Sequence, residues 1–399
     1  MEYKEAEELL ISKVRLLDTE TISIDVAFNR VLAEDLIATK NIPPFNRSPL
    51  DGYCFNYIDT VGITANNPKK FQIIEEVPCG KVASKKVEKN QAIKILTGAK
   101  MPEGANAVVR YEDVEVDGGY ILLKDEFKEN QNVILIGEDV KEGMVLAKKG
   151  SIVDMGVVGI AASLGIKELT VYKKIKIGFI STGSELLEID EEFVDGKIYN
   201  SNRYIFDAIL KKYNIECKYY GIVFDDVEML KKTFKMAINE CDIVMSTGGV
   251  SVGDYDLVDK ALEEIGFDIF VKGINMKPGM ACCFAESNNK IILGLSGNPM
   301  SSVTTFYAVC LPAIKKMMGY SDFENKYFKV KLKNSYYKKI YKLRFLRAKV
   351  SIEEGMAVAT LNLDQGNIVI KSLIDCNAMV KAENGVEVKE GEYLDCMYL

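Results

Sequence analysis

Carboxylates beside glycine-rich loops are the residues of this chain with the clearest potential for chemistry. The stretch Asp242 to Asp256, DIVMSTGGVSVGDYD, begins with a short apolar run, Ile243 to Met245, that is typical of a buried strand. It continues as a Ser/Thr/Gly loop, Ser246 to Gly253, and then reaches Asp254 and Asp256 where the next helix should begin. In an open α/β sheet the carboxyl ends of strands, unpaired backbone N–H groups and helix N-termini face the same space, so this loop suits an anionic ligand.

Two further carboxylates follow strand-like runs in the same way. Glu185 comes after the run Ile175 to Ser181, and Asp225 comes after the run Glu216 to Val223. Parallel strands would bring Glu185, Asp225 and Asp256 to one edge of a sheet. Taken singly, each is more often a helix cap. Three of them beside glycine-rich loops favour a site for a hard cation such as Mg²⁺.

Cationic and amide groups follow the next two predicted strands. Lys272 and Lys277 lie in the sequence VKGINMKPGM, and the tripeptide Gly297-Asn298-Pro299 precedes a long apolar helix. Lysines can neutralise phosphate or another oxyanion, and free N–H groups at a helix start can bind one. The alternative is a pair of solvated lysines and an ordinary helix cap. A ligand that carries both phosphate and metal would need both kinds of group.

Composition limits the chemistry that is available. The chain has 399 residues, enough for two to four domains, and contains no histidine, which excludes Ser-His-Asp and Cys-His nucleophiles and the usual zinc ligand sets. Its nine cysteines form no CxxC pair, and its net charge of −7, with both signs mixed along the chain, argues against nucleic-acid binding. No apolar run reaches the roughly 20 residues of a membrane span, and Met1 to Leu10 carry four glutamates, so we expect a cytoplasmic protein.

The elements that must position these residues change character along the chain. Glu2 to Val14 predicts an amphipathic packing helix, and glycine-punctuated short runs from Tyr53 to Asp139 predict a small inserted β-domain. From Ile175 onward strands alternate with helices, which indicates a mostly parallel sheet covered by helices on both faces. Tyr327 to Leu399 contains no convincing helix and suggests a small β-barrel or sandwich.

Many ordered motifs together resemble those of the molybdopterin molybdenumtransferases, a family that includes the E domain of gephyrin. The motifs are Pro43-Pro44 with Ser48-Pro49-Leu50-Asp51-Gly52-Tyr53, Thr97-Gly98 with Pro102 to Val109, Gly137-Glu138-Asp139, Ser181 to Leu186, Asp225-Asp226, Thr247 to Asp254, Lys277-Pro278-Gly279 and Gly297-Asn298-Pro299. The resemblance implies a multidomain α/β protein: an N-terminal and linking region (1–41 and 142–174), an inserted β-domain (42–141), a three-layer α/β molybdopterin-binding-like domain (175–326) and a C-terminal β-barrel (327–399).

The resemblance also implies an activity and a set of site residues. The reaction would insert molybdate into adenylylated molybdopterin with Mg²⁺-dependent release of AMP, in a homodimer whose active cleft is shared between subunits. The catalytic carboxylates would be Asp51, Asp139, Glu185, Asp225 and Asp256, of which the last three would hold the metal. The residues that bind the substrates would be Thr182, Gly183, Ser246, Gly248, Gly249, Ser251, Gly253, Asp254, Lys272, Lys277, Pro278, Gly279, Gly297, Asn298, Pro299, Arg344 and Arg347.

Two other functions are compatible with the same α/β module. A molybdopterin adenylyltransferase would need neither the inserted β-domain nor the barrel. A non-catalytic scaffold that holds molybdopterin would gain by losing negative charge near a polyanion, whereas this chain has all five carboxylates. Candidate macromolecular partners are a separate molybdopterin adenylyltransferase and the molybdoenzymes or their chaperones.

Overall fold

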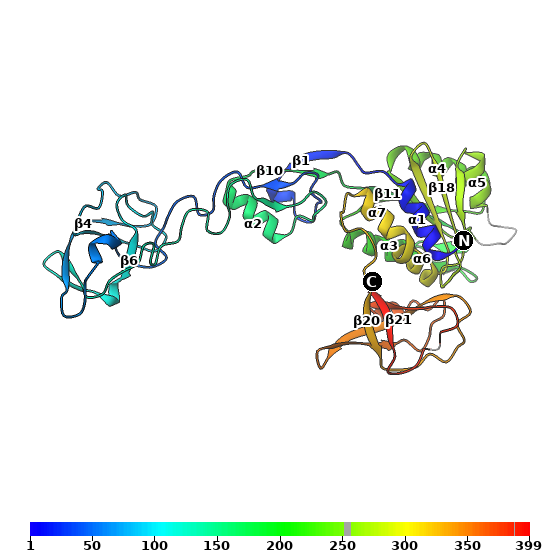
Figure 1. Ribbon diagram of the computed structural model, residues 1–399. Coiled ribbons are helices and arrows are strands. Elements are labelled where there is room, and N and C mark those ends of the chain that lie inside the picture. The colour runs from blue at the N-terminus through cyan, green and yellow to red at the C-terminus, as the bar shows by residue number, and fades with distance from the viewer. Residues whose placement is uncertain (251–256, 387) are drawn as a thin grey trace.

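The computed structural model describes residues 1–250, 257–386 and 388–399. Figure 1 shows an elongated molecule with the inserted β-domain at one end and the α/β domain at the other, joined by a narrow linking region. The C-terminal barrel lies beside the α/β domain and far from the insert (Figure 1). In the part of the chain that is described, no helix is long and apolar enough to cross a membrane.

A six-stranded sheet forms the centre of the α/β domain, with strand order β14-β11-β15-β19-β18-β16. The strands are β11 (Lys176–Thr182), β14 (Glu216–Val223), β15 (Ile243–Thr247), β16 (Asp268–Lys272), β18 (Cys282–Ser287) and β19 (Lys290–Leu295). The first four strands in this order, β14, β11, β15 and β19, pair in parallel, whereas β18 is antiparallel to both of its neighbours. The sheet is therefore mixed at one edge, which the alternation of strands and helices did not reveal.

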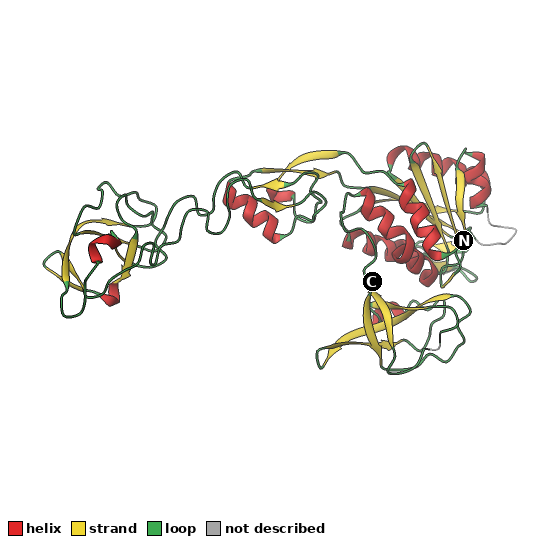
Figure 2. Cartoon of the chain, in the orientation of Figure 1, coloured by secondary structure: helices red, strands yellow, loops and turns green. Residues whose placement is uncertain are grey.

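Helices cover both faces of this sheet, as the alternation predicted (Figure 2). They are α1 (Tyr3–Lys13), α3 (Ser201–Lys212), α4 (Val227–Glu240), α5 (Val258–Glu264), α6 (Pro299–Thr305), a π-helical turn (Phe306–Cys310) and α7 (Leu311–Met317). One buried cluster joins α1, α3, α6 and α7 to the sheet, and a second joins α4 and α5 to its other face. The first helix thus packs on the α/β domain although it precedes the linking region in sequence.

The linking region is held by short antiparallel pairs between its two passages of chain. Its elements are β1 (Thr19–Ser23), β2 (Leu36–Ile37), β9 (Val145–Ala147), α2 (Met155–Leu164) and β10 (Glu168–Tyr172), with β1 paired to β10 and β2 to β9. Helix α2 has a cap at each end. It begins at Asp154, whose carboxylate accepts the Val157 N–H at 3.0 Å, and ends at Gly165 in the left-handed conformation.

The inserted β-domain is a six-stranded sheet with its own core. Its strands are β3 (Gly52–Phe55), β4 (Lys69–Val77), β5 (Gln91–Ile95), β6 (Ala107–Arg110), β7 (Glu115–Asp117) and β8 (Tyr120–Leu123), in the order β6-β3-β5-β4-β8-β7. Phe55 and Phe71 are fully buried in it, with ring centroids 5.5 Å apart.

The C-terminal region is the expected β-barrel. Its strands are β20 (Phe328–Leu332), β21 (Leu343–Glu353), β22 (Met356–Leu361), β23 (Ala378–Ala382) and β24 (Tyr393–Tyr398), and the additional pairing of β21 with β23 closes the ring. One short helix, α8 (Ser372–Asp375), interrupts it, although no helix was expected here. The strand β17 (Met276–Lys277) leaves the α/β domain and pairs with β21, so the barrel is tied to the loop after β16.

Candidate functional site

A cleft of about 660 Å³ opens at the carboxyl ends of the parallel strands. It receives the loops that follow β11, β14, β15 and β19, together with the N-terminus of α3. The residues that line it are Thr182, Gly183, Glu185, Leu186, Ile198, Tyr199, Asn200, Ser201, Asn202, Asp225, Gly248, Gly249, Val250, Ala281, Ser296, Gly297, Asn298, Pro299, Ile368 and Ile370. Most of the residues proposed from sequence on this sheet edge are therefore brought together.

Close packing between strand ends explains the glycine at position 248. Its φ is +99°, and a Cβ placed there would lie 2.3 Å from the carbonyl oxygen of Thr182. Thr182 is buried and donates its hydroxyl to the carbonyl oxygen of Thr247 at 3.2 Å. Only glycine fits this contact, and it lets the backbone after β15 approach the end of β11.

Two carboxylates occupy one side of the cleft. Asp225 accepts hydrogen bonds at Oδ2 from the Ser184 hydroxyl at 3.0 Å and the Ser184 N–H at 3.3 Å, which links the loops after β14 and β11. Glu185 follows directly on the second of these loops and also lines the cleft. By contrast, the adjacent Asp226 caps α4 by accepting the Met229 N–H at 2.8 Å, so only the first aspartate of the pair faces the cleft.

A second hollow of about 440 Å³ adjoins the cleft and shares Ala281, Ser296 and Asn298 with it. It is formed where the loop containing Lys277, Pro278 and Gly279 meets the barrel. The remaining residues that line it are Met276, Met280, Ser301, Lys339, Ile340, Tyr341, Lys342, Arg344 and Asn367. Its charged groups are Lys277, Lys339, Lys342 and Arg344.

The two hollows carry opposite charge. Among the residues that the structure describes, the charged side chains lining the larger hollow are Glu185 and Asp225, and those lining the smaller one are all cationic. Carboxylate oxygens suit a hard cation, whereas lysine and arginine suit an oxyanion or phosphate. One continuous site can therefore hold a cation at one end and an oxyanion at the other.

Several predicted residues lie elsewhere. Lys272 ends the edge strand β16 and forms an ion pair with Asp259 of α5 at 2.6 Å, which raises the pKa of its ammonium group. Arg347 is 1% exposed inside the barrel and donates to the carbonyl oxygens of Asp364 and Gly366 at 3.0 Å each, so it shapes the neighbouring loop. Ser246 is fully buried within β15 and does not line either hollow.

Asp51 and Asp139 are not brought to this cleft by their own chain. Both are exposed: Asp51 directly precedes β3 of the inserted β-domain, and Asp139 lies where the chain leaves that domain for the linking region. Figure 1 shows the inserted β-domain at the opposite end of the molecule from the α/β domain. The Asp51 carboxylate accepts the Thr97 N–H at 2.7 Å and the Thr97 hydroxyl at 2.8 Å. These hydrogen bonds, chiefly the one from the backbone, lower the pKa of Asp51 and keep it ionised.

Four of the proposed residues, Ser251, Gly253, Asp254 and Asp256, lie outside the described part of the chain. Within the described part, no three His, Cys, Asp or Glu side chains gather closely enough to hold a metal ion by themselves. The donors described for a metal in the cleft are thus the oxygens of Glu185 and Asp225.

Sequence reasoning missed the asparagines at the start of α3. Asn200 is 1% exposed and donates to the Ser181 hydroxyl at 2.9 Å and the Tyr219 hydroxyl at 3.0 Å. Asn202 donates to the carbonyl oxygen of Gly297 at 2.7 Å, which ties α3 to the loop after β19. The sequence Asn-Ser-Asn immediately before a helical pattern was a detectable N-cap signal. The cationic residues Lys339 and Lys342 were also missed.

Comparisons with known proteins agree with this geometry. Residues 1–165 match the MoeA N-terminal region (domain I and II), and residues 178–316 match a probable molybdopterin binding domain. A molybdopterin molybdenumtransferase of Staphylococcus epidermidis is 34% identical over 94% of this chain and 90% of its own length. The corresponding protein of Staphylococcus aureus is 33% identical over 96% of this chain and 91% of its own length.

Solved structures give the same result. The crystal structure of a molybdopterin biosynthesis moeA protein from Pyrococcus horikoshii superimposes with a TM-score of 0.87 at 33% identity and covers both chains completely. A molybdenum cofactor biosynthesis protein from Pyrococcus furiosus shares the fold, with a TM-score of 0.61 at 18% identity over 100% of this chain and 99% of its own.

The three-layer domain, insert, barrel and cleft define a multidomain protein of the molybdopterin-binding class. The chain belongs to the molybdopterin molybdenumtransferase family. It is a molybdopterin molybdenumtransferase of molybdenum cofactor biosynthesis, which confirms the fold class, the family and the class of enzyme expected from the sequence.

Proposed function

We propose that this enzyme inserts molybdate into adenylylated molybdopterin and releases AMP in a Mg²⁺-dependent reaction. The observation that carries the proposal is the separation of charge along the continuous site, with carboxylates in the larger hollow and cations in the smaller one. In net terms an oxygen of molybdate or water passes to the AMP phosphate, and the dithiolene sulfurs take oxygen positions on molybdenum, with oxygen leaving as water. Molybdenum is neither oxidised nor reduced.

The chain's own residues divide this task. Lys277 and Arg344 lie directly across from one another on the paired strands β17 and β21, line the same hollow, and bind the oxyanion substrate by charge. Glu185 and Asp225 would hold Mg²⁺, which when bound neutralises phosphate oxygens and assists cleavage of the phosphoanhydride. Their oxygen donors fit this hard cation.

A second copy of the chain completes the site in this proposal. Asp51 and Asp139 lie far from the cleft of their own chain (Figure 1), and the family resemblance assigns them to catalysis. In a homodimer the insert of one subunit would reach the cleft of its partner. We further place the enzyme in the cytoplasm, with a molybdopterin adenylyltransferase and molybdoenzymes or their chaperones as candidate partners.

Binding measurements test the division of labour within the cleft. Lys277→Met should weaken molybdate binding in equilibrium dialysis by about tenfold or more while leaving Mg²⁺ binding unchanged. Glu185→Gln should do the reverse. If both substitutions weaken the same ligand, the separated cation and oxyanion sites are wrong.

Subunit complementation tests the shared site. Asp51→Asn and Glu185→Gln homodimers should both be inactive. A mixed dimer of the two variants has one intact site and one doubly substituted site if the cleft is shared, so it should recover about half of the wild-type activity per dimer. If each chain forms its own complete site, both sites of the mixed dimer are damaged, and no activity returns.

A further inference from the structure

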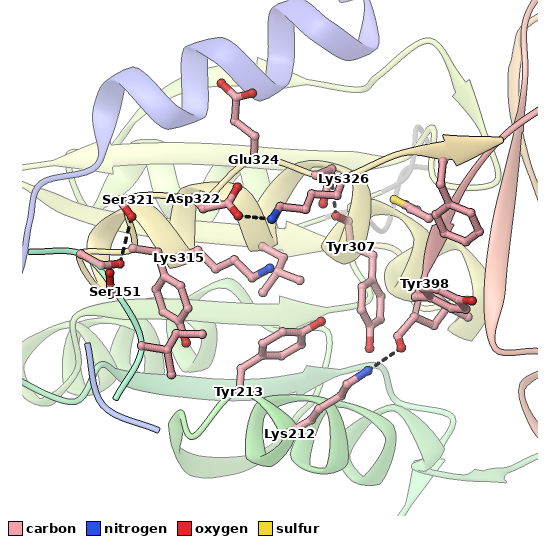
Figure 3. Close-up of a pocket in the computed structure, with 18 of the residues that line it drawn as sticks. Ser151, Lys212, Tyr213, Tyr307, Lys315, Ser321, Asp322, Glu324, Lys326 and Tyr398 are labelled. Atoms are coloured by element: carbon pink, nitrogen blue, oxygen red, sulfur yellow. Dashed lines mark hydrogen bonds and ion pairs between the residues drawn. The ribbon is translucent and has the colours of Figure 1, made fainter. Parts of the chain in front are cut away.

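A third hollow, separate from the two at the carboxyl ends of the strands, lies where the linking region, the α/β domain and the barrel meet. It measures about 650 Å³, within the range of small-molecule sites. Ser151 reaches it from the linking region, Tyr213 and Lys315 from the α/β domain, and Tyr398 from the barrel (Figure 3). We call it the junction pocket.

Lys315 supplies to the junction pocket a positive charge that has no direct ion-pair partner among the described residues, although the Asp322 carboxylate acts on it at longer range. Its side chain extends from α7 into the hollow, and its ammonium lies 5.3 Å from the centre of the Tyr213 ring (Figure 3). Among the described residues, no carboxylate or carbonyl oxygen forms an ion pair or hydrogen bond with this ammonium. Burial lowers the pKa of Lys315, because the charged form is incompletely solvated. An anion would relieve that cost.

Every other charged group lining the junction pocket is engaged or turned away. Asp322 is paired with Lys326, and Lys212 donates to a main-chain oxygen of Leu399, which follows β24. The Asp154 carboxylate caps α2, and the Glu324 carboxylate points away from Lys315 (Figure 3). Among the described residues lining the pocket, Lys315 is therefore the cation available to a ligand.

Tyrosine side chains provide flat walls and hydroxyl donors around this cation. Tyr213 and Tyr307 meet edge to face with centroids 6.4 Å apart, and Tyr320 also lines the hollow. Burial raises the pKa of Tyr213 and Tyr307, so both hydroxyls stay protonated, and each side chain also influences the pKa of the other. Tyr307 lies in the π-helical turn, and Asn325 caps two carbonyl oxygens there at 3.0 Å each. Such π-turns are frequent at functional sites.

We propose that the junction pocket binds a small oxyanion carried on an aromatic ring, with Lys315 as its charge partner and tyrosine side chains against the ring. A bare phosphate would leave most of the 650 Å³ unfilled. A ligand held here would touch the linking region, the α/β domain and the barrel together, and so would fix their relative positions.

Phenyl phosphate is the probe, with inorganic phosphate and phenol as partial ligands. Isothermal titration calorimetry reports the binding of each probe, because phenol absorbs and emits light in the same range as the 20 tyrosines of the chain and would mask their fluorescence. Lys315→Met keeps the apolar stem and removes the charge. Lys316→Met is the matched control, since Lys316 on the same helix donates to the carbonyl oxygen of Ile11 at 3.0 Å.

The expected result is saturable binding of phenyl phosphate that Lys315→Met weakens by about tenfold or more and Lys316→Met leaves unchanged. In the wild-type protein, saturating phenyl phosphate should slow acetylation of Lys315, measured by mass spectrometry, while acetylation of Lys316 keeps its rate. This second readout holds even if Lys315→Met fails to fold. No binding, binding unaffected by Lys315→Met, or phosphate binding as tightly as phenyl phosphate would overturn the proposal.

Discussion

The two adjacent aspartates after β14 have different roles, so substituting each in turn should separate effects on activity from effects on stability. Asp225 lines the cleft, whereas Asp226 caps α4 through its 2.8 Å hydrogen bond with the Met229 N–H. We compare Asp225→Ala with Asp226→Ala. The first should lower kcat for molybdenum insertion by about 10²–10³-fold, the usual loss when one electrostatic contact to a transition state is removed.

The expected stability changes run in the opposite order. Asp225 is exposed and its hydrogen bonds with Ser184 are 3.0 and 3.3 Å long, so its loss should cost about 1 kcal/mol or less. Loss of the Asp226 cap should lower the free energy of unfolding by about 1 kcal/mol and Tm by about 2–4 °C, because the Met229 N–H in the first turn of α4 then lacks its acceptor.

The assay is AMP release at saturating substrates, together with thermal unfolding followed by circular dichroism. Asp225→Ala should be folded and inactive, and Asp226→Ala should be active and slightly less stable. Full activity in Asp225→Ala, or an inactive but folded Asp226→Ala, would refute the assignment of the two carboxylates.

Three further outcomes follow from the contacts described. Arg344→Met should weaken molybdate binding with little change in Tm. Arg347→Met should remove the donor of two partly buried carbonyl oxygens and destabilise the barrel by about 1–3 kcal/mol in denaturant unfolding, less the relief from removing a buried charge whose Nε and Nη1 have no partner; equal effects of the two changes on molybdate binding would contradict this. Gly248→Ala should abolish activity and lower stability by about 1–3 kcal/mol, because its φ is +99° and its Cβ would collide with the end of β11; unchanged kinetics would count against the close packing. Thr97→Val should raise the pKa of Asp51, measured by NMR titration, because it removes the hydroxyl hydrogen bond, one of the two that lower this pKa. In the wild-type protein, ionised Asp51 contributes to stability above the ordinary aspartate pKa. This contribution is lost as the pH falls through the lower pKa of the folded state. An unchanged pKa in Thr97→Val would mean that the backbone N–H alone sets it.

Local pattern was sufficient for most of the elements that carry the site. Strand β14 coincides with the predicted run Glu216 to Val223, and β11 and β15 overlap the runs Ile175 to Ser181 and Ile243 to Met245 that were predicted for them. Strand β18 was missed although its signal was present. Asn288 and Asn289 both have positive φ and join β18 to β19 in a two-residue hairpin, a turn for which asparagine is suited.

Other features depend on contacts between residues far apart in sequence. The cationic hollow exists because Lys277 pairs in register with Arg344, and no local signal predicts the pairing of β17 with β21. Likewise, the position of Lys272 after a predicted strand suggested a ligand-binding lysine, but in the structure it forms an ion pair with Asp259 of α5. The sequence shows which side chains are charged, but only the tertiary fold shows which groups they contact.

The central claim is that this enzyme couples molybdate insertion to release of AMP. The most direct measurement is AMP release from adenylylated molybdopterin by the purified protein with Mg²⁺, with and without molybdate. We predict that AMP release depends on molybdate, stops when Mg²⁺ is chelated, and is accompanied by molybdenum bound to the pterin. Tight binding of the adenylylated substrate with no AMP released under any of these conditions would contradict the proposed reaction.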